Sequence, residues 1–256
     1  KSLVSIMTKL SDAKFRYGFT GTLDGTQTHK WVLEGLFGPV YKATSTAELM
    51  EKGQLATFKI KCLILKYDES ICKQARSWDY QTEIDYIVKS KPRNEFIKNL
   101  VLSLKGNTLV LFQFVEKHGK ELYANIKEAA GKRQVFFVFG GTDVEIRESV
   151  RAITEKENDA IIVASYGTFS TGINIKSLHN VIFASPSKSR VRNLQSIGRV
   201  LRKGKNKTKA VLYDISDDCT IQSRKNYTLN HFIERIKIYN EEQFNYEIIT
   251  IQLKSK

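Results

Sequence analysis

The residues of this sequence with the clearest chemical potential are basic side chains gathered between residues 160 and 213. This stretch of 54 residues contains no Asp or Glu. It carries ten basic residues, which are Lys176, Lys188, Arg190, Arg192, Arg199, Arg202, Lys203, Lys205, Lys207 and Lys209. The 256-residue chain has a net charge of +14, so about a fifth of its length holds +10 of it. Because like charges gathered in one place attract a polyanion, the stretch predicts a site for nucleic acid or nucleotide, with plain solubility charge as the alternative.

A helix predicted over Ser189–Lys203 would aim several of these side chains in one direction. At about 100° per residue, its polar face carries Arg192, Gln195, Arg199 and Arg202. Leu194, Ile197 and Leu201 lie on another face and can seat the helix on a sheet. A guanidinium stays charged and binds phosphate oxygens in pairs, which suits the charge on a transferring phosphoryl group. The alternative is a solvated basic face that binds nothing in particular.

A loop predicted over Ser165–Ile175 follows the apolar strand at residues 160–164. It contains two glycines and four Ser or Thr residues, and no acidic residue lies near it. Backbone N–H groups and hydroxyls can hold phosphate oxygens without any side-chain charge. The loop therefore favours a phosphate-binding role, and a generic Ser/Gly loop is the alternative.

Together these two segments resemble motifs of the superfamily 2 helicases and translocases. Residues 195–202 (QSIGRVLR) resemble the Q-x-x-G-R-x-x-R motif VI, and residues 165–175 resemble motif V. Residues 19–23 (FTGTL) are similar to motif III, and residues 109–113 (LVLFQ) to motif IV. Residues 139–142 (FGGT) are similar to the adjoining phosphate-contacting motif. The five segments occur in the family's order and at its spacing, so the sequence is identified as a member of that superfamily.

The resemblance implies ATP with Mg²⁺ as cofactor, with the Mg²⁺ ligands outside this chain. Arg202 would be the arginine finger on the γ-phosphate, Arg199 would assist it, and Gln195 would link the site to motif V. The implied nucleotide-binding residues are Gly172, Asn174, Arg199 and Arg202. Many relatives have Asp where Asn174 stands. The implied nucleic-acid contacts are Gln113, Gly140, Gly141, Thr142, Ser165 and Thr168. Coupling of nucleotide state to domain closure would fall to Thr20, Gly21 and Thr22.

The parts of such a motor that bind the ATP phosphates and the metal are absent from the sequence. Three Gly-Lys pairs occur, and none belongs to a G-x-x-x-x-G-K-[S/T] phosphate loop. No Asp-Glu pair stands in a Walker-B-like context. In this family both parts precede motif III, in the first RecA-like lobe. We therefore expect these 256 residues alone not to hydrolyse ATP.

The elements that must position the motifs form a regular alternation. Strands that are apolar on both faces alternate with helices, which predicts an α/β fold with a parallel sheet covered on both sides. The resemblance makes this a RecA-like sheet. Ligands of such sheets bind at the carboxyl ends of the strands, here the loops at 112–116, 140–143, 165–174 and 186–190. Further strands are predicted at 15–19, 57–67 and 246–253, and a helix at 226–244.

The resemblance also predicts a division of the chain. Residues 1–45 would be the end of the first RecA-like lobe, and residues 46–90 a linker and entry into the second. Residues 91–222 would be the complete second lobe, the helicase C-terminal domain. Residues 223–256 would be a small helical C-terminal extension.

The remaining composition narrows the setting. Three cysteines without a C-x-x-C pair fit thiols in a reducing cytosol, in a host cell if the protein is viral. Four scattered histidines predict no metal site, and no apolar run is long enough for a membrane span. We expect an ATP-dependent DNA helicase that remodels branched or forked DNA in recombination, repair and replication, acting as a monomer, with RNA–DNA hybrids as a further substrate. Two alternatives stay open, a double-strand translocase without unwinding and an ATP-independent binding or annealing module.

Overall fold

The structure is a computed structural model that describes residues 2–21, 23, 26–172, 175–187, 189–203 and 207–253. The chain divides into two compact units, residues 1–45 and residues 46–256. In the first unit, the described helices are α1 (Ser2–Thr8) and α2 (Gln27–Phe37). The side chain of Thr26 accepts a hydrogen bond from the backbone N–H of His29 and so caps the start of α2. Gly38, with φ of 89°, ends it.

The strand predicted at residues 15–19 is wrong. This segment belongs to no strand, and Phe15, Tyr17 and Phe19 are 70 %, 76 % and 96 % exposed. A strand needs a neighbour to accept its backbone hydrogen bonds. The described part of this unit contains only helices, so the alternating pattern finds no such neighbour.

The second unit is built on one sheet of seven parallel strands in the order β3-β4-β2-β5-β6-β1-β7. The strands are β1 (Thr57–Lys66), β2 (Thr108–Phe112), β3 (Val135–Val138), β4 (Ile161–Ser165), β5 (Asn180–Phe183), β6 (Lys209–Asp218) and β7 (Asn245–Gln252). The first and last of these, β1 and β7, come from outside residues 91–222 and pair with each other within the same sheet. Because all the strands are parallel, their carboxyl ends lie along one edge of the sheet.

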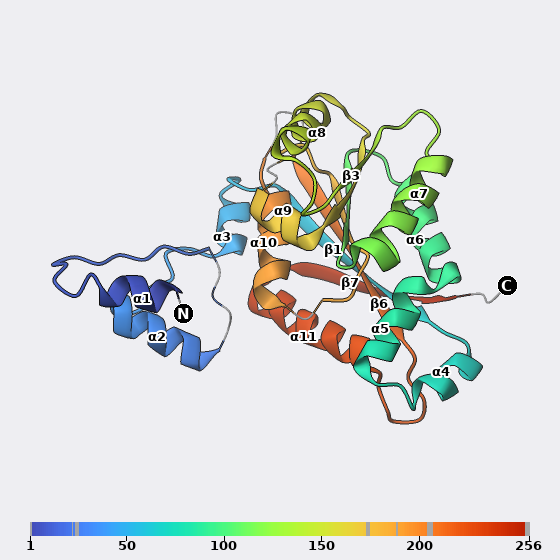
Figure 1. The fold of residues 1–256 in the computed structure, drawn as a ribbon, viewed down its shortest axis with the longest axis horizontal. Coiled ribbons are helices and arrows are strands. Elements are labelled where there is room, and N and C mark those ends of the chain that lie inside the picture. The colour runs from blue at the N-terminus through green and yellow to red at the C-terminus, as the bar shows by residue number, and fades with distance from the viewer. Residues whose placement is uncertain are drawn as a thin grey trace. The chain divides into compact units, whose positions relative to one another are not determined.

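Helices cover both faces of this sheet, as Figure 1 shows. One face is covered by α8 (Val144–Lys156), α9 (Tyr166–Gly172), α10 (Arg190–Val200) and α11 (Tyr227–Glu241). The other is covered by α4 (Glu69–Ala75), α5 (Tyr80–Lys89), α6 (Lys91–Ser103) and α7 (Lys120–Ala129), which a π-helical turn, η1 (Val115–Gly119), precedes. The short α3 (Thr46–Glu51) leads into β1. None of the helices in the described part of the chain is long and apolar enough to cross a membrane.

The strand β2 shows how the sequence produces this layering. Leu109 and Leu111 pack into the core on the α8–α11 side, and Val110 and Phe112 into the core on the α4–α7 side. All five residues of β2 are fully buried. Full burial of such a side chain contributes about 1.5–3 kcal/mol, so a central strand apolar on both faces is held from both sides. The predicted α/β fold of the RecA-like type is confirmed.

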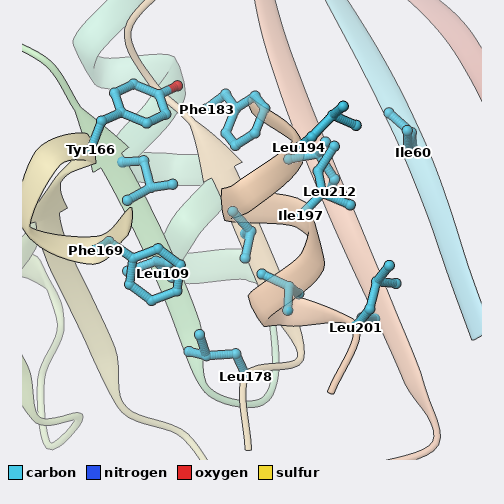
Figure 2. Packing of buried hydrophobic residues seen from close by; sticks show 14 of the residues in the cluster. Ile60, Leu109, Tyr166, Phe169, Leu178, Phe183, Leu194, Ile197, Leu201 and Leu212 are labelled. Atoms are coloured by element: carbon cyan, nitrogen blue, oxygen red, sulfur yellow. The ribbon is translucent and has the colours of Figure 1, made fainter. Parts of the chain in front are cut away.

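One predicted element differs from the structure at motif V. Residues 166–172, predicted as a loop, form the helix α9. Its Gly and hydroxyl residues have low helix propensity, but Tyr166 and Phe169 lie one helical turn apart and are 1 % and 0 % exposed. Figure 2 shows both rings in the same apolar cluster as Leu194 and Ile197 of α10. Packing on the sheet therefore decides the helix, and local propensity does not.

Candidate nucleic-acid and nucleotide sites

The carboxyl edge of the sheet gathers most of the residues predicted to contact nucleic acid. Gln113 follows β2, Gly140 and Gly141 follow β3, and Ser165 ends β4. Gln113, Gly140 and Gly141 are exposed, and Ser165 is half-buried. The predicted placement of the loops at 112–116 and 140–143 at this edge is therefore confirmed.

A buried hydrogen-bond chain holds the end of β2 in place. The backbone N–H of Gln113 donates to Ser185 Oγ at 3.0 Å, and Ser185 Oγ lies 2.9 Å from His118 Nδ1. The Tyr166 hydroxyl donates to the carbonyl of Ser185 at 3.1 Å. Burial, with the positive charge of Arg93 nearby, lowers the pKa of His118 to about 3. A neutral imidazole inside the fold thus fixes the backbone that presents the Gln113 side chain.

The turn after β3 presents backbone to solvent. Thr142 Oγ1 accepts from the backbone N–H of Phe139 at 3.0 Å, and the N–H of Thr142 donates to the Phe139 carbonyl at 2.9 Å. A Cβ on Gly141 would lie 2.8 Å from the Phe139 ring, whereas one on Gly140 would meet nothing within 4 Å. The Thr142 side chain is therefore used within the turn, and the two exposed glycines leave room for a ligand to approach the backbone.

The start of α9 combines two hydroxyls. Ser165 Oγ and Thr168 Oγ1 lie 2.8 Å apart, and the N–H of Thr168 lies 3.4 Å from Ser165 Oγ. Thr168 is only 5 % exposed, so in this conformation its hydroxyl is used in the hydrogen bond with Ser165 and does not face solvent. Ser165, Gly167 and the start of the helix are the parts of motif V that face the carboxyl edge. Asn174 lies outside the described residues, and Gly172 is the last residue of α9.

The motif VI arginines lie at the opposite edge. The helix α10 connects the carboxyl end of β5 to the amino end of β6, so it runs back across the sheet. Just beyond its end, the Leu201 carbonyl accepts from the N–H of Ala56, which precedes β1. Arg199 and Arg202 are therefore at the amino edge, and motif V and motif VI, neighbours in sequence, serve two separate places.

Two like charges meet at this amino edge. Arg199 is half-buried and Arg202 is exposed. Burial first, and then the positive charge of Arg202, lower the pKa of Arg199. Guanidinium groups close enough to repel each other are stabilised by a shared anion, so this pair fits the phosphates of a nucleotide. Gln195 is exposed on the same helix.

Arg202 does not lie on the helix that the sequence predicted. The helix ends at Val200, so Arg202 belongs to the turn that follows. Lys207, which the sequence showed only as one of several basic residues, is 2 % exposed. Its Nζ donates to the carbonyls of Val200 and of Arg202, the latter at 3.1 Å. Nothing in a run of alternating lysines distinguishes this buried one, because its role depends on where the helix ends.

The other predicted residues divide as follows. Thr20 and Gly21 are exposed in the first unit, and Thr22 lies outside the described residues. In the described part of the chain, no group of three or more His, Cys, Asp or Glu could hold a metal ion. The residues that the structure describes do not make a Mg²⁺ site.

Comparison with known proteins identifies part of this chain. Residues 92–204 match the family model described as the helicase conserved C-terminal domain. This segment contains β2 to β5 and α10, and hence both edges described above. The resemblance to superfamily 2 helicases is confirmed.

Similar proteins extend the match over the whole chain. The sequence is 36 % identical over 266 residues to the ATP-dependent DNA helicase uvsW of Enterobacteria phage T4, covering 99 % of this chain and 52 % of that protein. The crystal structure of T4 UvsW matches with a TM-score of 0.68 and 34 % identity, over 99 % of this chain and 51 % of that one. A fragment of a putative type I restriction HsdR subunit from Vibrio vulnificus YJ016 matches with a TM-score of 0.61 at 15 % identity, over 91 % of this chain and 43 % of that one, which shows the shared fold. The chain spans about half the length of the T4 helicase.

Proposed function

We propose that this helicase C-terminal domain acts within an ATP-dependent DNA helicase that remodels branched DNA. The observation that carries the proposal is that the sheet separates two groups of predicted site residues, one at each of its edges. Exposed glycines and a serine lie at the carboxyl edge, and a pair of like-charged arginines lies at the amino edge. The similarity to a DNA helicase over 99 % of the chain supports the choice of DNA.

The division of labour follows from the chemistry of each edge. At the carboxyl edge, backbone N–H groups around Gly140 and Gly141 and the hydroxyl of Ser165 hold nucleic-acid phosphates without reading sequence. At the amino edge, Arg202 places its guanidinium on the γ-phosphate of ATP held by a preceding RecA-like lobe, and Arg199 binds the same phosphates. Charge that develops during phosphoryl transfer is stabilised there. Closing and reopening of the two lobes then shifts the grip at the carboxyl edge by a step.

We also propose that the chain is organised as its motifs suggest. Residues 1–45 are the end of the first lobe, with Thr20, Gly21 and Thr22 coupling the two lobes. Residues 46–90 enter the second lobe, residues 91–222 form its main part, and residues 223–256 are an extension. The chain alone binds DNA without hydrolysing ATP. DNA-stimulated hydrolysis by these 256 residues would refute that part of the proposal.

The central test is Arg202→Ala in the complete protein. DNA-stimulated ATP turnover is expected to fall at least about a thousandfold, since an arginine finger contributes about 10³ to 10⁵ in rate. Lys203→Ala is the matched control, because it removes a neighbouring positive charge that is also exposed. DNA affinity should be nearly the same in both variants. Undiminished turnover in Arg202→Ala would exclude the finger assignment. A displacement assay on forked DNA, compared with triplex displacement, separates unwinding from translocation on duplex DNA.

A further inference from the structure

The backbone that carries Arg202 is tied down although it lies beyond the end of α10. The last carbonyls of a helix have no partner within the helix. Here the carbonyls of Val200, Leu201 and Arg202 all have partners from elsewhere in the fold. Lys207 Nζ donates to the carbonyls of Val200 and Arg202. The backbone N–H of Ala56 donates to the carbonyl of Leu201 at 2.9 Å.

Lys207 is well suited to this place. A positive charge at the carboxyl end of a helix interacts favourably with the helix dipole, and an ammonium group has three donors to share. Lys207 stands just before β6, and its side chain, which is 2 % exposed, donates to these two carbonyls. It therefore connects the turn that carries Arg202 to a central strand of the sheet.

We propose that Lys207 is a positioning residue that holds the Arg202 guanidinium in its working place through the Arg202 backbone. This inference rests on the role proposed for Arg202 above. A reacting geometry that is displaced by about 1 Å can cost about a hundredfold in rate. An arginine on a loose turn would sample many such positions, whereas the two bonds from Lys207 restrict them.

The surroundings of Lys207 make this restraint dependent on pH. Among the described residues, two other titratable groups interact with Lys207 electrostatically. They are the carboxylate of Glu155 on α8 and the imidazole of His179 before β5. Burial lowers the pKa of Lys207 from 10.5 to about 8, against the opposing effect of Glu155. Burial and then the charge of Lys207 lower the pKa of His179 below its usual range. The imidazole is therefore already neutral in the pH range where Lys207 loses its proton. Above pH 8, Lys207 becomes an amine, which makes weaker hydrogen bonds than an ammonium group.

The first experiment compares Lys207→Met with Lys209→Met in the complete protein. Both changes remove one positive charge, but Lys209 is exposed at the start of β6. We expect kcat for ATP to fall about tenfold or more in Lys207→Met, with DNA affinity unchanged and with little effect in Lys209→Met. Hydrogen exchange of the peptide covering residues 197–203 should become faster only in Lys207→Met. Wild-type turnover and wild-type exchange in Lys207→Met would overturn the proposal.

The second experiment uses Lys207→Arg, which keeps a charge that does not titrate in this range. The wild-type kcat should fall by about threefold or more between pH 7.5 and 9.5, and the profile of Lys207→Arg should stay flat there. This test also stands if Lys207→Met does not fold. If the pH profiles of kcat for the wild type and for Lys207→Arg coincide, the positioning role is refuted. If Arg202→Ala retains turnover, the finger assignment in the proposed function fails, and the inference about Lys207 fails with it. If Arg202→Ala is inactive and Lys207→Met is fully active, only the inference about Lys207 fails.

Discussion

The buried ion pair between Asp214 and Arg235 should be one of the most sensitive points of the fold. Asp214 on β6 is 0 % exposed and Arg235 on α11 is 1 % exposed. Arg235 binds both carboxylate oxygens, at 2.8 Å from Nε and 2.8 Å from Nη2, and it also donates to Ser216 Oγ and to the Ser187 carbonyl. The Tyr239 hydroxyl donates to Asp214 at 2.8 Å. Every one of these bonds is out of reach of water, so nothing replaces the carboxylate once it is removed.

Asp214→Ala would leave the guanidinium buried and without its counter-charge. Removing one partner of a buried pair costs about 3–5 kcal/mol. With a denaturant slope of about 3 kcal/mol per M in urea, the unfolding midpoint should fall by about 1–1.7 M. Urea unfolding of the chain, followed by far-ultraviolet circular dichroism, measures this shift. The bond from Arg235 to Ser187 also orients the segment that leads into α10, so the loss extends toward the motif VI helix.

Two comparisons make this test decisive. Glu234→Ala, one residue away on α11, breaks an ion pair whose side chains are 62 % and 56 % exposed, and it should cost at most about 1 kcal/mol. The double variant Asp214→Leu/Arg235→Met should recover most of the stability, since apolar replacement of a whole buried pair is often neutral. If Asp214→Ala is no more destabilising than Glu234→Ala, the reasoning about the buried pair is wrong.

Two further predictions concern the carboxyl edge. His118 has a pKa of about 3 in the folded protein and about 6.5 when unfolded. Between pH 6.5 and pH 3, His118 therefore binds a proton only in the unfolded state. The free energy of unfolding should drop by about 1.4 kcal/mol for each pH unit in this range. His118→Gln should lose that part of the slope in acid denaturation curves, and an unchanged slope would show that His118 is not buried as a neutral group. Thr168→Ala should weaken DNA binding several-fold through Ser165 and lower the salt dependence slightly, as fluorescence anisotropy titrations at several salt concentrations can measure. Equal affinities would exclude this start of α9 from the DNA site.

Much of the architecture could be predicted from the sequence because the pattern of apolar residues there is strong enough to indicate one type of element. Residues 109–112 are apolar without interruption, and a short apolar run between predicted helices fits a strand covered on both faces. The prediction failed where local composition and tertiary packing disagree. The residues of α9 look like a loop, but Tyr166 and Phe169 bury both rings and hold the segment as a helix. The aromatic alternation at residues 15–19 looks like a strand, but the described part of its unit offers no strand to pair with.

The sequence by itself determined the kind of chemistry. Ten basic residues without one acid between residues 160 and 213 predict an anionic partner, and the types and order of the motif residues indicate a helicase. Only the tertiary structure decided where that chemistry occurs. One strand and one returning helix carry Ser165 and Arg202 to opposite edges of the sheet, because parallel strands force every connection to cross back. The same folding buried Lys207 under the turn of Arg202 and left Lys209 in solvent, a difference that depends on where a helix ends and which face of a strand is covered.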